Sequence, residues 1–544
     1  MKTSRYPIEN SLPPFICGIT GRSYSAAEVK YRIECLSAAL AAELGIEVNG
    51  GSEFDKVIGL FSVNTIDTTT ISWTAHRFSG VSSPISPSYS AAELTRQLKA
   101  VKCKALFTCA TLFPTAIEAA SAANIPKKHV YLVEIPEKTR RGATVPPDIK
   151  SVDQLIEEGK KLAPLPVVKW EQGQGARQTA FLCSSSGTSG LPNNVMISHR
   201  NIIANTLQLS TFESNYKSGK PESLLAVLPM SHSHAPIVAG HAGVYRGYNA
   251  VVLPGLDLLD VLEAVQKHSI ETLWMVPPMI VAMIRNSAVT AKYNLDHVKA
   301  TVVGASNLTK EINEQFARLL PKCQLIKGYG LTETAVVASL QNKADIMFGS
   351  CGHIFPGYEG RLISPNGDKA TKEAFTEDGW LRTGDLMEFR KSDGGHEHLF
   401  IVDRVKELIK VRGLQVSPTE LEAFLSRHPS IADVCVVPSP DDVAGELPLA
   451  FVALSPAGKE EDERILKQNI HDFVDGELAE YKRLAGGIEF LEALPKSASG
   501  KTKRGEMKER AKRMSEAGKA RKLPKVLQVF VYESSDDETS EDDE

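Results

Sequence analysis

The run SSSGTSGLP (residues 184–192) gathers small, hydroxyl-bearing and glycine residues between two apolar stretches. Backbone N–H groups that glycine exposes, together with hydroxyl donors, are the groups that hold an anionic phosphate. We expect a phosphate-binding loop formed by Ser185, Ser186, Gly187, Thr188, Ser189 and Gly190. No Gly-Lys-Ser/Thr follows, so the run is not a Walker A loop. A flexible surface loop is the alternative interpretation of such a run taken alone.

Two further stretches favour a nucleotide site. KGYGLTETA (residues 327–335) places Thr332 and Glu333 after a glycine-rich turn, and a hydroxyl beside a carboxylate suits a phosphate with its Mg²⁺. GWLRTGDL (residues 379–386) sets Asp385 after a Thr-Gly pair, and its carboxylate can accept hydrogen bonds from both ribose hydroxyls. Each stretch alone could be a turn with a capping residue. The three in this order indicate nucleotide binding.

The elements that must position these residues alternate between helix and strand. Residues 25–44 have helical apolar spacing, residues 56–64 form a short β-rich run, and residues 223–230, 249–255, 272–278 and 300–306 are apolar runs that close on Pro or Gly. This alternation predicts an α/β fold with a largely parallel sheet. Shorter strands around an SDGG turn, followed by a helix N-capped by Ser417, predict a small α+β domain. We expect domains at 1–402 and 403–510, with a charged, disordered tail at 511–544.

Composition excludes several other classes of protein. A net charge of -4 over 544 residues argues against a general nucleic-acid binder. Eight cysteines without a CxxC pair indicate free thiols in a reducing compartment. The most apolar stretch, residues 273–284, is too short to span a bilayer and contains two prolines. We expect a cytoplasmic protein, without a membrane span, that is a monomer or a weak homodimer.

The motifs as a set resemble those of the adenylate-forming superfamily, the acyl- and aryl-CoA synthetases, and most of all fungal 4-coumarate–CoA ligase-like enzymes. The resemblance runs from about Gly21 to about Arg504, and its motifs are SSSGTSGLP, LPMSHSH, VGASNLTKE, GYGLTET, GWLRTGDL, DRVKELIKVRGLQVSPTELE and LPKSASGKTKR. It implies a large N-terminal domain of two α/β subdomains and a β-subdomain, followed by a small mobile domain. It also implies that ATP and Mg²⁺ activate a carboxylic acid as an acyl-adenylate, which CoA then converts to a thioester.

The same resemblance assigns a role to each residue that matches a motif. By position, the nucleotide is bound by Ser185 to Gly190 at the pyrophosphate end, by Gly304, Ala305 and Ser306 on the adenine side, by Tyr329 against the base, and by Asp385 and Arg404 at the ribose. The reaction centre contains Thr332 at the α-phosphate, Glu333 on Mg²⁺, His232 near the acyl-adenylate, Lys410, Gly413 and Gln415 from the small domain, Lys406 as hinge, and Lys501 as the adenylation lysine. A mobile ammonium such as Lys501 stabilises the charge that develops during displacement at phosphorus.

The chain departs from the family pattern at three places. Asn193 and Asn194 stand where the family has Lys-Gly or Lys-Ala. The missing lysine charge predicts a slower ATP step, and Asn193→Lys should raise the adenylation rate. Between Asp368 and Lys369 a strand block of the β-subdomain is missing, which indicates a variant fold, a degraded paralogue or an imperfectly assigned gene. The chain ends in Asp-Asp-Glu, without a peroxisomal Ser-Lys-Leu-type signal.

Three functions remain open at this stage. The first is a CoA ligase for a small aromatic or medium-chain acid, with Trp274, Met275, Val276, Met279 and Val336 as candidate pocket walls. The second is an adenylate former with another acceptor, such as a carrier-protein thiol. The third is a catalytically weakened paralogue. A zinc site of His232, His234 and His241 is disfavoured because no fourth ligand stands out.

Overall fold

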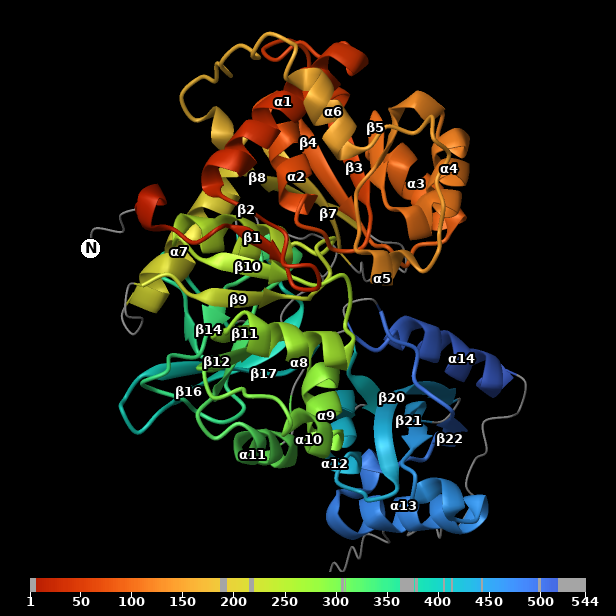
Figure 1. Ribbon diagram of the computed structural model, residues 1–544. Helices are drawn as coiled ribbons and strands as arrows, with labels where there is room; N and C mark the ends of the chain where they lie inside the picture. The colour runs from red at the N-terminus through yellow and green to blue at the C-terminus, as the bar shows by residue number, and fades with distance from the viewer. Residues whose placement is uncertain are drawn as a thin grey trace, which may run out of the picture. The chain divides into compact units, whose positions relative to one another are not determined.

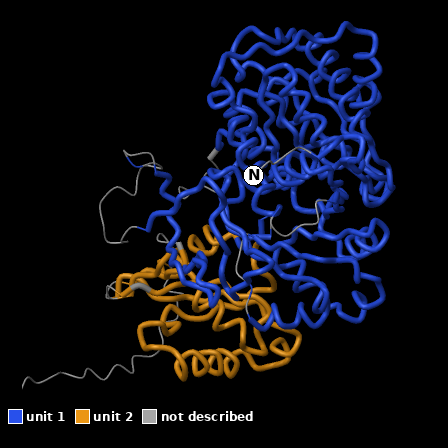
Figure 2. The backbone as a smooth tube through the Cα atoms, turned by 90° about the vertical axis from the view of Figure 1, so that its left-hand side faces the viewer, with its two compact units in different colours: residues 1–402, 496–502 blue, residues 403–495, 503–544 orange. Residues whose placement is uncertain are grey.

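The chain forms two compact units. The computed structural model describes residues 6–185, 193–214, 220–304, 308, 310–362, 376, 380–404, 407–411, 414–441, 444–497 and 500–516. The first unit is residues 1–402 with 496–502, and the second is residues 403–495 with 503–544 (Figure 2). The short segment 496–502 therefore groups with the first unit, although the chain on both sides of it belongs to the second.

A six-stranded sheet occupies the N-terminal part of the first unit (Figure 1). Its strands, in spatial order, are β6 (Val130–Leu132), β5 (Ala105–Thr108), β3 (Val57–Phe61), β4 (Val81–Ile85), β7 (Thr179–Ser185) and β8 (Asn193–Ser198). All neighbours pair in parallel except β7 and β8. Every residue of β3, β4 and β5 is buried, as expected for parallel strands covered on both faces.

Helices cover both faces of this sheet. One face packs against α1 (Ala26–Leu44), α2 (Thr68–Arg77) and α6 (Val152–Gly159), and the other against α3 (Ala91–Ala100) and α4 (Phe113–Ala122). Three of these helices begin at a capping box, in which a serine and a Glu or Gln three residues later satisfy free N–H groups at the helix start: Ser25 with Glu28, Ser90 with Glu93, and Ser151 with Gln154. The sequence therefore sets these helix starts locally.

A nine-stranded sheet forms the rest of the unit's core. Its strands, in spatial order, are β15 (His353–Ile354), β14 (Ser339–Leu340), β13 (Gln324–Tyr329), β12 (Ala300–Val303), β11 (Thr272–Met275), β9 (Ser223–Ala226), β10 (Asn249–Val252), β1 (Phe15–Cys17) and β2 (Ser23–Tyr24). The strands from β13 to β1 run parallel, and β2, β14 and β15 are antiparallel additions. A separate two-stranded ribbon consists of β16 (Asp385–Lys391) and β17 (Glu397–Arg404).

The nine-stranded sheet is also enclosed on both faces. One face packs against α8 (Leu258–Lys267), α9 (Pro277–Arg285) and α11 (Lys310–Leu319), and the other against α7 (His199–Ser214) and the π-helix η6 (Ala235–Gly243). Short helices complete the unit: α5 (Glu137–Arg140), α10 (Ser287–Thr290), and the 3₁₀ turns η1 (Ile8–Asn10), η2 (Glu53–Asp55), η3 (Ala110–Leu112), η4 (Lys127–His129), η5 (Gln174–Ala176) and η7 (Thr332–Thr334).

The second unit is a small α+β fold. Its sheet contains β19 (Leu414–Val416), β18 (Ile409–Val411), β21 (Gly445–Leu454) and β20 (Ile431–Asp441), with β22 (Gly487–Leu491) beside β21. One face packs against α12 (Pro418–Leu425) and α13 (Glu463–Glu477), and the other against α14 (Arg504–Glu516). Two 3₁₀ turns, η8 (Gly458–Glu460) and η9 (Glu480–Lys482), connect these elements.

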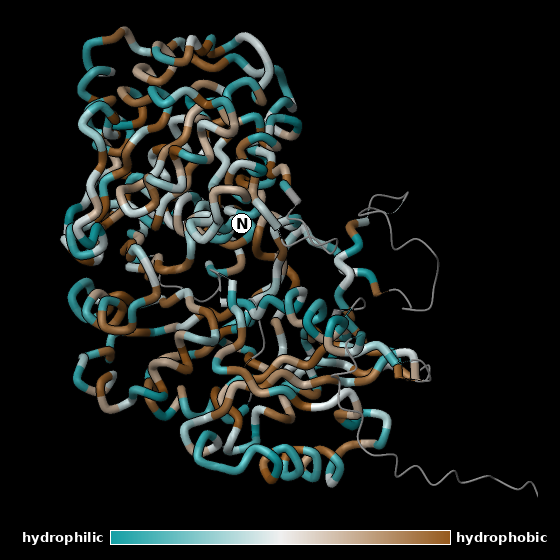
Figure 3. The backbone as a smooth tube through the Cα atoms, turned by 90° about the vertical axis from the view of Figure 1, so that its right-hand side faces the viewer, coloured by the Kyte–Doolittle hydropathy of each residue, from teal (hydrophilic) through white to brown (hydrophobic). Residues whose placement is uncertain are grey.

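Hydropathy follows this architecture. Hydrophobic residues lie along the strands and the inner faces of the helices, and hydrophilic residues recur along the outer helices (Figure 3). The α/β fold class is confirmed, and so are the helix capped by Ser417 and the hairpin turn at residues 392–395. Within the described residues no helix is long and apolar enough to cross a membrane. The place around residues 368–369 where a missing strand block was predicted, and most of the predicted tail, lie outside the described residues.

Candidate functional site

Two of the predicted nucleotide residues, Gly304 and Tyr329, lie at one edge of the nine-stranded sheet. Strands β12 and β13 are parallel neighbours, with Val303 opposite Lys327, so both end at the same edge. Gly304 directly follows β12, and Tyr329 is the last residue of β13. Ligands of open α/β sheets bind outside the carboxyl ends of such strands. A Cβ added at Gly304 would have no atom within 4 Å, so this position leaves open space beside the edge.

Tyr329 and Asp385 are brought together across 56 positions of sequence. The Tyr329 hydroxyl donates a 2.6 Å hydrogen bond to Oδ2 of Asp385, the first residue of β16. Gly384, with φ +72°, turns the chain immediately before it, in a conformation that L-residues rarely adopt. The Asp385 amide also donates to the Thr383 hydroxyl at 3.2 Å. The carboxylate is thereby held in place beside the tyrosine.

Thr332 and Glu333 lie on a strained turn. They open the 3₁₀ turn η7; Thr332 is buried and Glu333 is exposed. The turn is followed by Ala335 and Val336 with φ of 52° and 93°, and a β-branched residue at positive φ is a genuine outlier. A Cβ at Gly330 would lie 1.5 Å from the Val336 carbonyl oxygen, so only glycine fits there. Strain of this kind persists where the surrounding structure enforces it, most often at functional sites.

The SHSH segment supplies polar groups to the same edge. The Ser233 hydroxyl lies 3.5 Å from the Thr332 hydroxyl, at hydrogen-bonding distance. Burial, and to a smaller extent the positive charge of Lys501, lower the pKa of His232 to about 4. Burial also lowers the pKa of His234 to about 3. Both imidazoles are therefore neutral at physiological pH.

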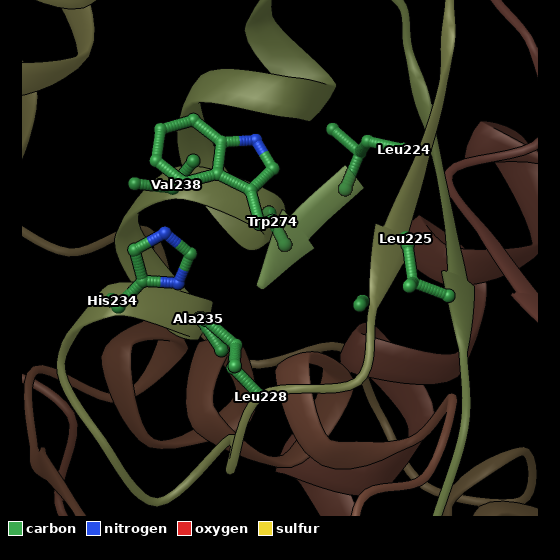
Figure 4. A pocket seen from close by; sticks show the side chains of 9 residues that line it. Leu224, Leu225, Leu228, His234, Ala235, Val238 and Trp274 are labelled. Atoms are coloured by element: carbon green, nitrogen blue, oxygen red, sulfur yellow. The ribbon is translucent and has the colours of Figure 1, made fainter. Parts of the chain in front are cut away.

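A small apolar pocket adjoins His234. It is lined by Leu224, Leu225, Ala226, Leu228, His234, Ala235, Val238, Ala239 and Trp274 (Figure 4). The His234 and Trp274 rings lie next to each other, with centroids 4.7 Å apart. Neither nitrogen of His234 has a hydrogen-bond partner. The pocket wall includes the start of the π-helix η6, a helix type that occurs frequently at functional sites.

The segment 496–502, which belongs to the first unit, approaches His232. Lys501 is close enough to affect the His232 pKa, and a Cβ on Gly500 would lie 3.3 Å from side-chain atoms of Val276 and Pro278. Gly500 has φ +79°, so the turn before Lys501 favours glycine. This geometry brings Lys501 to the histidine that the sequence placed near the acyl-adenylate.

The histidines at 232, 234 and 241 do not converge on one point. Both ring nitrogens of His241 are in hydrogen-bonding contact with other groups. Nδ1 is 2.7 Å from the Pro236 carbonyl oxygen, and Nε2 accepts a hydrogen bond from the Trp73 indole at 2.9 Å. Among the described residues they form no group with metal-ligand spacing.

Several predicted site residues lie elsewhere or outside the description. Lys410, in β18 of the second unit, is exposed, pairs in register with Gln415, and its amide donates to Glu446 Oε2 at 2.8 Å. Ser185 ends β7 opposite Asn193. The remaining predicted residues lie outside the described residues or have undescribed side chains: Ser186, Gly187, Thr188, Ser189, Gly190, Ala305, Ser306, Lys406 and Gly413, with the side chains of Asn193, Arg404 and Gln415.

Sequence reasoning missed two features of this region. Ser233 beside Thr332 could have been found from the SHSH motif, whose alternate residues were examined only as histidines. The positive φ values of Ala335 and Val336 had no signal in the residue types.

In the second unit, Asp403 accepts hydrogen bonds from the Ser417 hydroxyl and the Thr419 amide, so it helps to cap α12.

Comparison with known proteins decides the family. Residues 13–377 match the model of the AMP-binding enzyme family, and residues 420–501 match that of the AMP-binding enzyme C-terminal domain. The chain belongs to the AMP-binding enzyme family. The predicted membership of the adenylate-forming superfamily is thereby confirmed.

Relatives and solved structures agree with this membership. This AMP-binding enzyme is 38% identical to the acyl-CoA ligase easD of Emericella nidulans, over 93% of this chain and 94% of the relative. Its fold is similar to that of the anthranilate CoA ligase AuaEII in complex with anthranoyl-AMP (TM-score 0.75, 18% identity, 95% and 100% covered). It is also similar to ATP-bound MatB from Rhodopseudomonas palustris (TM-score 0.73, 21% identity, 90% and 94% covered).

Proposed function

We propose that this AMP-binding enzyme is an ATP-dependent acyl-CoA ligase. It activates a carboxylic acid as an acyl-adenylate with release of pyrophosphate, and then transfers the acyl group to the CoA thiol with release of AMP. The observation that carries the proposal is the Tyr329–Asp385 hydrogen bond at the carboxyl edge of β12 and β13, beside the Thr332–Glu333 turn. The acyl-CoA ligase from Emericella nidulans, similar over almost its whole length, supports it.

The nucleotide is bound by residues that are already oriented. The Tyr329 ring packs against adenine while its hydroxyl holds Asp385 in place. The second carboxylate oxygen of Asp385 then accepts from the ribose, and a fixed acceptor loses little entropy on binding. Gly304, followed by Ala305 and Ser306, lines the adenine side. Arg404 lies near the ribose in this proposal, and the phosphates bind the loop from Ser185 to Gly190.

The residues fit a magnesium ion. Glu333 presents an exposed carboxylate next to the Thr332 hydroxyl, and Mg²⁺ prefers oxygen ligands that it shares with substrate phosphates. Glu333 would hold the ion, which neutralises phosphate charge when bound. The Thr332 hydroxyl donates to the α-phosphate. Ser233, within reach of Thr332, keeps that hydroxyl oriented.

Lys501 supplies the charge that the first reaction needs. As the acid carboxylate attacks the α-phosphate, negative charge grows on the transferring oxygens, and a nearby ammonium stabilises it. His232 next to Lys501 is neutral, so it can donate a hydrogen bond without competing for the same charge. Lys410, Gly413 and Gln415 serve the thioester step after the second unit moves about Lys406. Asn193 takes the place of the family's loop lysine and slows the ATP step.

The acid is a small aromatic or medium-chain one. The pocket beside His234 is lined mainly by Leu, Ala and Val side chains, with Trp274 across it, which suits an apolar acyl group of the kind that 4-coumarate–CoA ligase-like enzymes accept. His234 has free nitrogens on this wall, so a hydroxyl or amino substituent on the acid would find a partner there. The cavity has a volume of about 10 Å³, room for about one water molecule, so an aromatic or medium-chain acid must displace the His234 or Trp274 ring.

Pyrophosphate release tests the proposal. The full chain is assayed with ATP, Mg²⁺ and a panel of carboxylic acids, with and without CoA. We expect acid-dependent release that falls at least about a hundredfold in Lys501→Ala, as for loss of one electrostatic group at the transition state. Lys503→Ala is the matched control, because Lys503 pairs with Glu506 on the surface.

Each outcome of this assay separates the candidate functions. Thioester formed only with CoA supports the ligase. Acyl-adenylate that persists with CoA, but is consumed by a carrier-protein thiol, indicates the other acceptor. A folded protein that binds ATP but releases no pyrophosphate with any acid is a weakened paralogue. Equal rates in Lys501→Ala and Lys503→Ala would contradict the role of Lys501.

A further inference from the structure

Three potential metal ligands converge at a place that the nucleotide site does not use. Asp345 lies between β14 and β15, His353 begins β15, and His398 lies on β17 of the ribbon. One ligand atom from each lies within 4.8 Å of the other two. Among the described residues this is the one His/Cys/Asp/Glu group with such spacing. All three belong to the first unit.

The distances suit a small divalent ion. Asp345 Oδ2 is 3.2 Å from His398 Nε2 and 3.8 Å from His353 Nε2. Ligands about 2.0–2.1 Å from a tetrahedral zinc ion lie about 3.3 Å from one another. The two histidine ligand atoms lie within 4.8 Å of each other, so the side chains must close by up to about 1.5 Å to place the three atoms around one ion. Two imidazoles and one carboxylate form a donor set that zinc uses, whereas Mg²⁺ and Ca²⁺ prefer oxygen ligands alone.

The opposite ring nitrogens are held by fixed partners. His353 Nδ1 is 3.1 Å from the Glu397 carbonyl oxygen, and His398 Nδ1 is 2.9 Å from the Ser350 hydroxyl. The Ser392 hydroxyl donates to Asp345 Oδ2 at 3.0 Å. Outer hydrogen bonds of this kind orient metal-ligating histidines and carboxylates, and they leave each Nε2 directed at the shared point.

One of the ligand atoms is buried without a hydrogen bond. His398 is fully buried, and among the described residues its Nε2 has no hydrogen-bond partner, although Asp345 Oδ2 is only 3.2 Å away. A close oxygen that is not aligned with the ring nitrogen is a poor acceptor. Buried polar atoms are nearly always satisfied, so an orphaned nitrogen aimed into a cluster of ligands itself points to an absent partner.

We propose that Asp345, His353 and His398 bind a divalent transition-metal ion of the zinc type, with water in the fourth position. The ion joins the β16–β17 ribbon to the β14–β15 edge of the nine-stranded sheet. Backbone bonds already align the two segments: the Cys351 amide donates to the Leu399 carbonyl at 2.7 Å, and the Leu399 amide to the Gly352 carbonyl at 2.9 Å. The metal adds side-chain bonds to this alignment.

The ribbon is where such a link is most useful. A two-stranded ribbon is marginally stable by itself, and here it begins at Asp385, the proposed ribose ligand. The resemblance to the family predicts that a strand block supporting this region is missing from this chain between Asp368 and Lys369. A bound ion fixes β17, and with it the paired strand that carries Asp385.

Zinc binding to the untagged full chain tests the site. Titration calorimetry after removal of metal is expected to show one tight equivalent of Zn²⁺, and Co²⁺ is expected to give the visible absorption of a tetrahedral site. Asp345→Asn and His353→Gln should each weaken binding at least about tenfold, since loss of even an outer partner costs 10–100-fold. His396→Gln is the matched control, because His396 is an exposed histidine beside the same cluster.

The outcomes decide the proposal without reference to ligase activity. Added Zn²⁺ should raise the melting temperature of the parent protein and of His396→Gln, but not of Asp345→Asn. Weak binding of Zn²⁺ to the acidic C-terminal residues is the same in every variant, and its contribution is subtracted from each titration. No tight equivalent in the parent protein, or equal affinity in Asp345→Asn and His353→Gln, overturns the site. If His396→Gln loses as much Zn²⁺ affinity as Asp345→Asn and His353→Gln, the assignment of Asp345, His353 and His398 as the three ligands is overturned.

Discussion

The two units of the chain differ in how completely their buried polar side chains are hydrogen-bonded. In the first unit, several buried side-chain atoms have no hydrogen-bond partner, among them both nitrogens of His234 and Nε2 of His398. Among the described residues of the second unit, no buried side-chain nitrogen or oxygen lacks one. Arg504 there donates to both carboxylate oxygens of Glu422, at 2.6 and 2.8 Å, and to the Val436 carbonyl oxygen at 2.6 Å.

This difference indicates which buried groups stabilise the fold and which are available to a ligand. A polar network whose donors and acceptors are all hydrogen-bonded makes a core rigid, and it leaves no donor or acceptor for a ligand. Unsatisfied groups and positive φ values cost stability, and they persist where a ligand can use them. In the first unit such costs are spread over several places, among them helix α2, the edge that carries the Thr332 turn, and the ribbon. In the second unit the Arg504 and Glu422 charges are paired with each other, which fixes that core.

The largest expected effect lies in the second unit. Arg504→Ala leaves the partly buried Glu422 carboxylate, 17% exposed, without its cation, and burial already raises the pKa of Glu422 while Arg504 opposes that rise. Breaking such a pair costs about 3 kcal/mol of unfolding free energy, the lower end of the range for buried pairs. Urea unfolding of the full chain measures it, with the exposed Lys512→Ala on the same helix as control. A loss below about 1 kcal/mol would mean that the network does not fix this core.

An intermediate effect is expected from acid in the first unit. Because burial lowers the pKa of His234 to about 3, the unfolded chain, with a histidine pKa near 6.5, binds the proton first as pH falls. The stability that neutral His234 contributes is therefore full above pH 6.5 and is lost as pH falls toward 3. Between pH 6.5 and 5 this one group costs about 2 kcal/mol. His234→Gln should flatten the dependence of melting temperature on pH, and an unchanged slope would contradict it.

The smallest effect is expected at the nucleotide site. Tyr329→Phe keeps the ring but removes the 2.6 Å hydrogen bond that orients Asp385. Loss of one such bond costs about 0.5–1.5 kcal/mol, or roughly a two- to twelvefold rise in the KM for ATP, with little change in melting temperature. Steady-state pyrophosphate assays measure it against Tyr358→Phe, whose hydroxyl bonds the Thr334 carbonyl instead. If Tyr358→Phe raises the KM for ATP more than Tyr329→Phe does, ATP binding depends more on the Tyr358–Thr334 hydrogen bond than on the one that orients Asp385.

Much of this structure could be predicted from local patterns. The strands at residues 57–61 and 300–303 and the helix from Ala26 follow from apolar periodicity and caps that a single sequence contains. The resemblance predicted Tyr329 at the base and Asp385 at the ribose, but their hydrogen bond was not predicted, because nothing local specifies a contact across 56 residues. The cluster of Asp345, His353 and His398 gave no signal, since its spacing along the chain matches no metal motif.

The hydrogen bonds that Asp403 accepts from Ser417 and Thr419 have a kinetic consequence. They tie the chain just before residues 405–406 to the start of α12. If the pivot of the second unit lies at Lys406, these bonds must break at each turnover, and the Thr419 amide exchanges its hydrogen faster when both substrates are present. If the pivot lies before Asp403, the bonds persist and exchange stays slow. One backbone amide thus reports where the chain bends during the catalytic cycle.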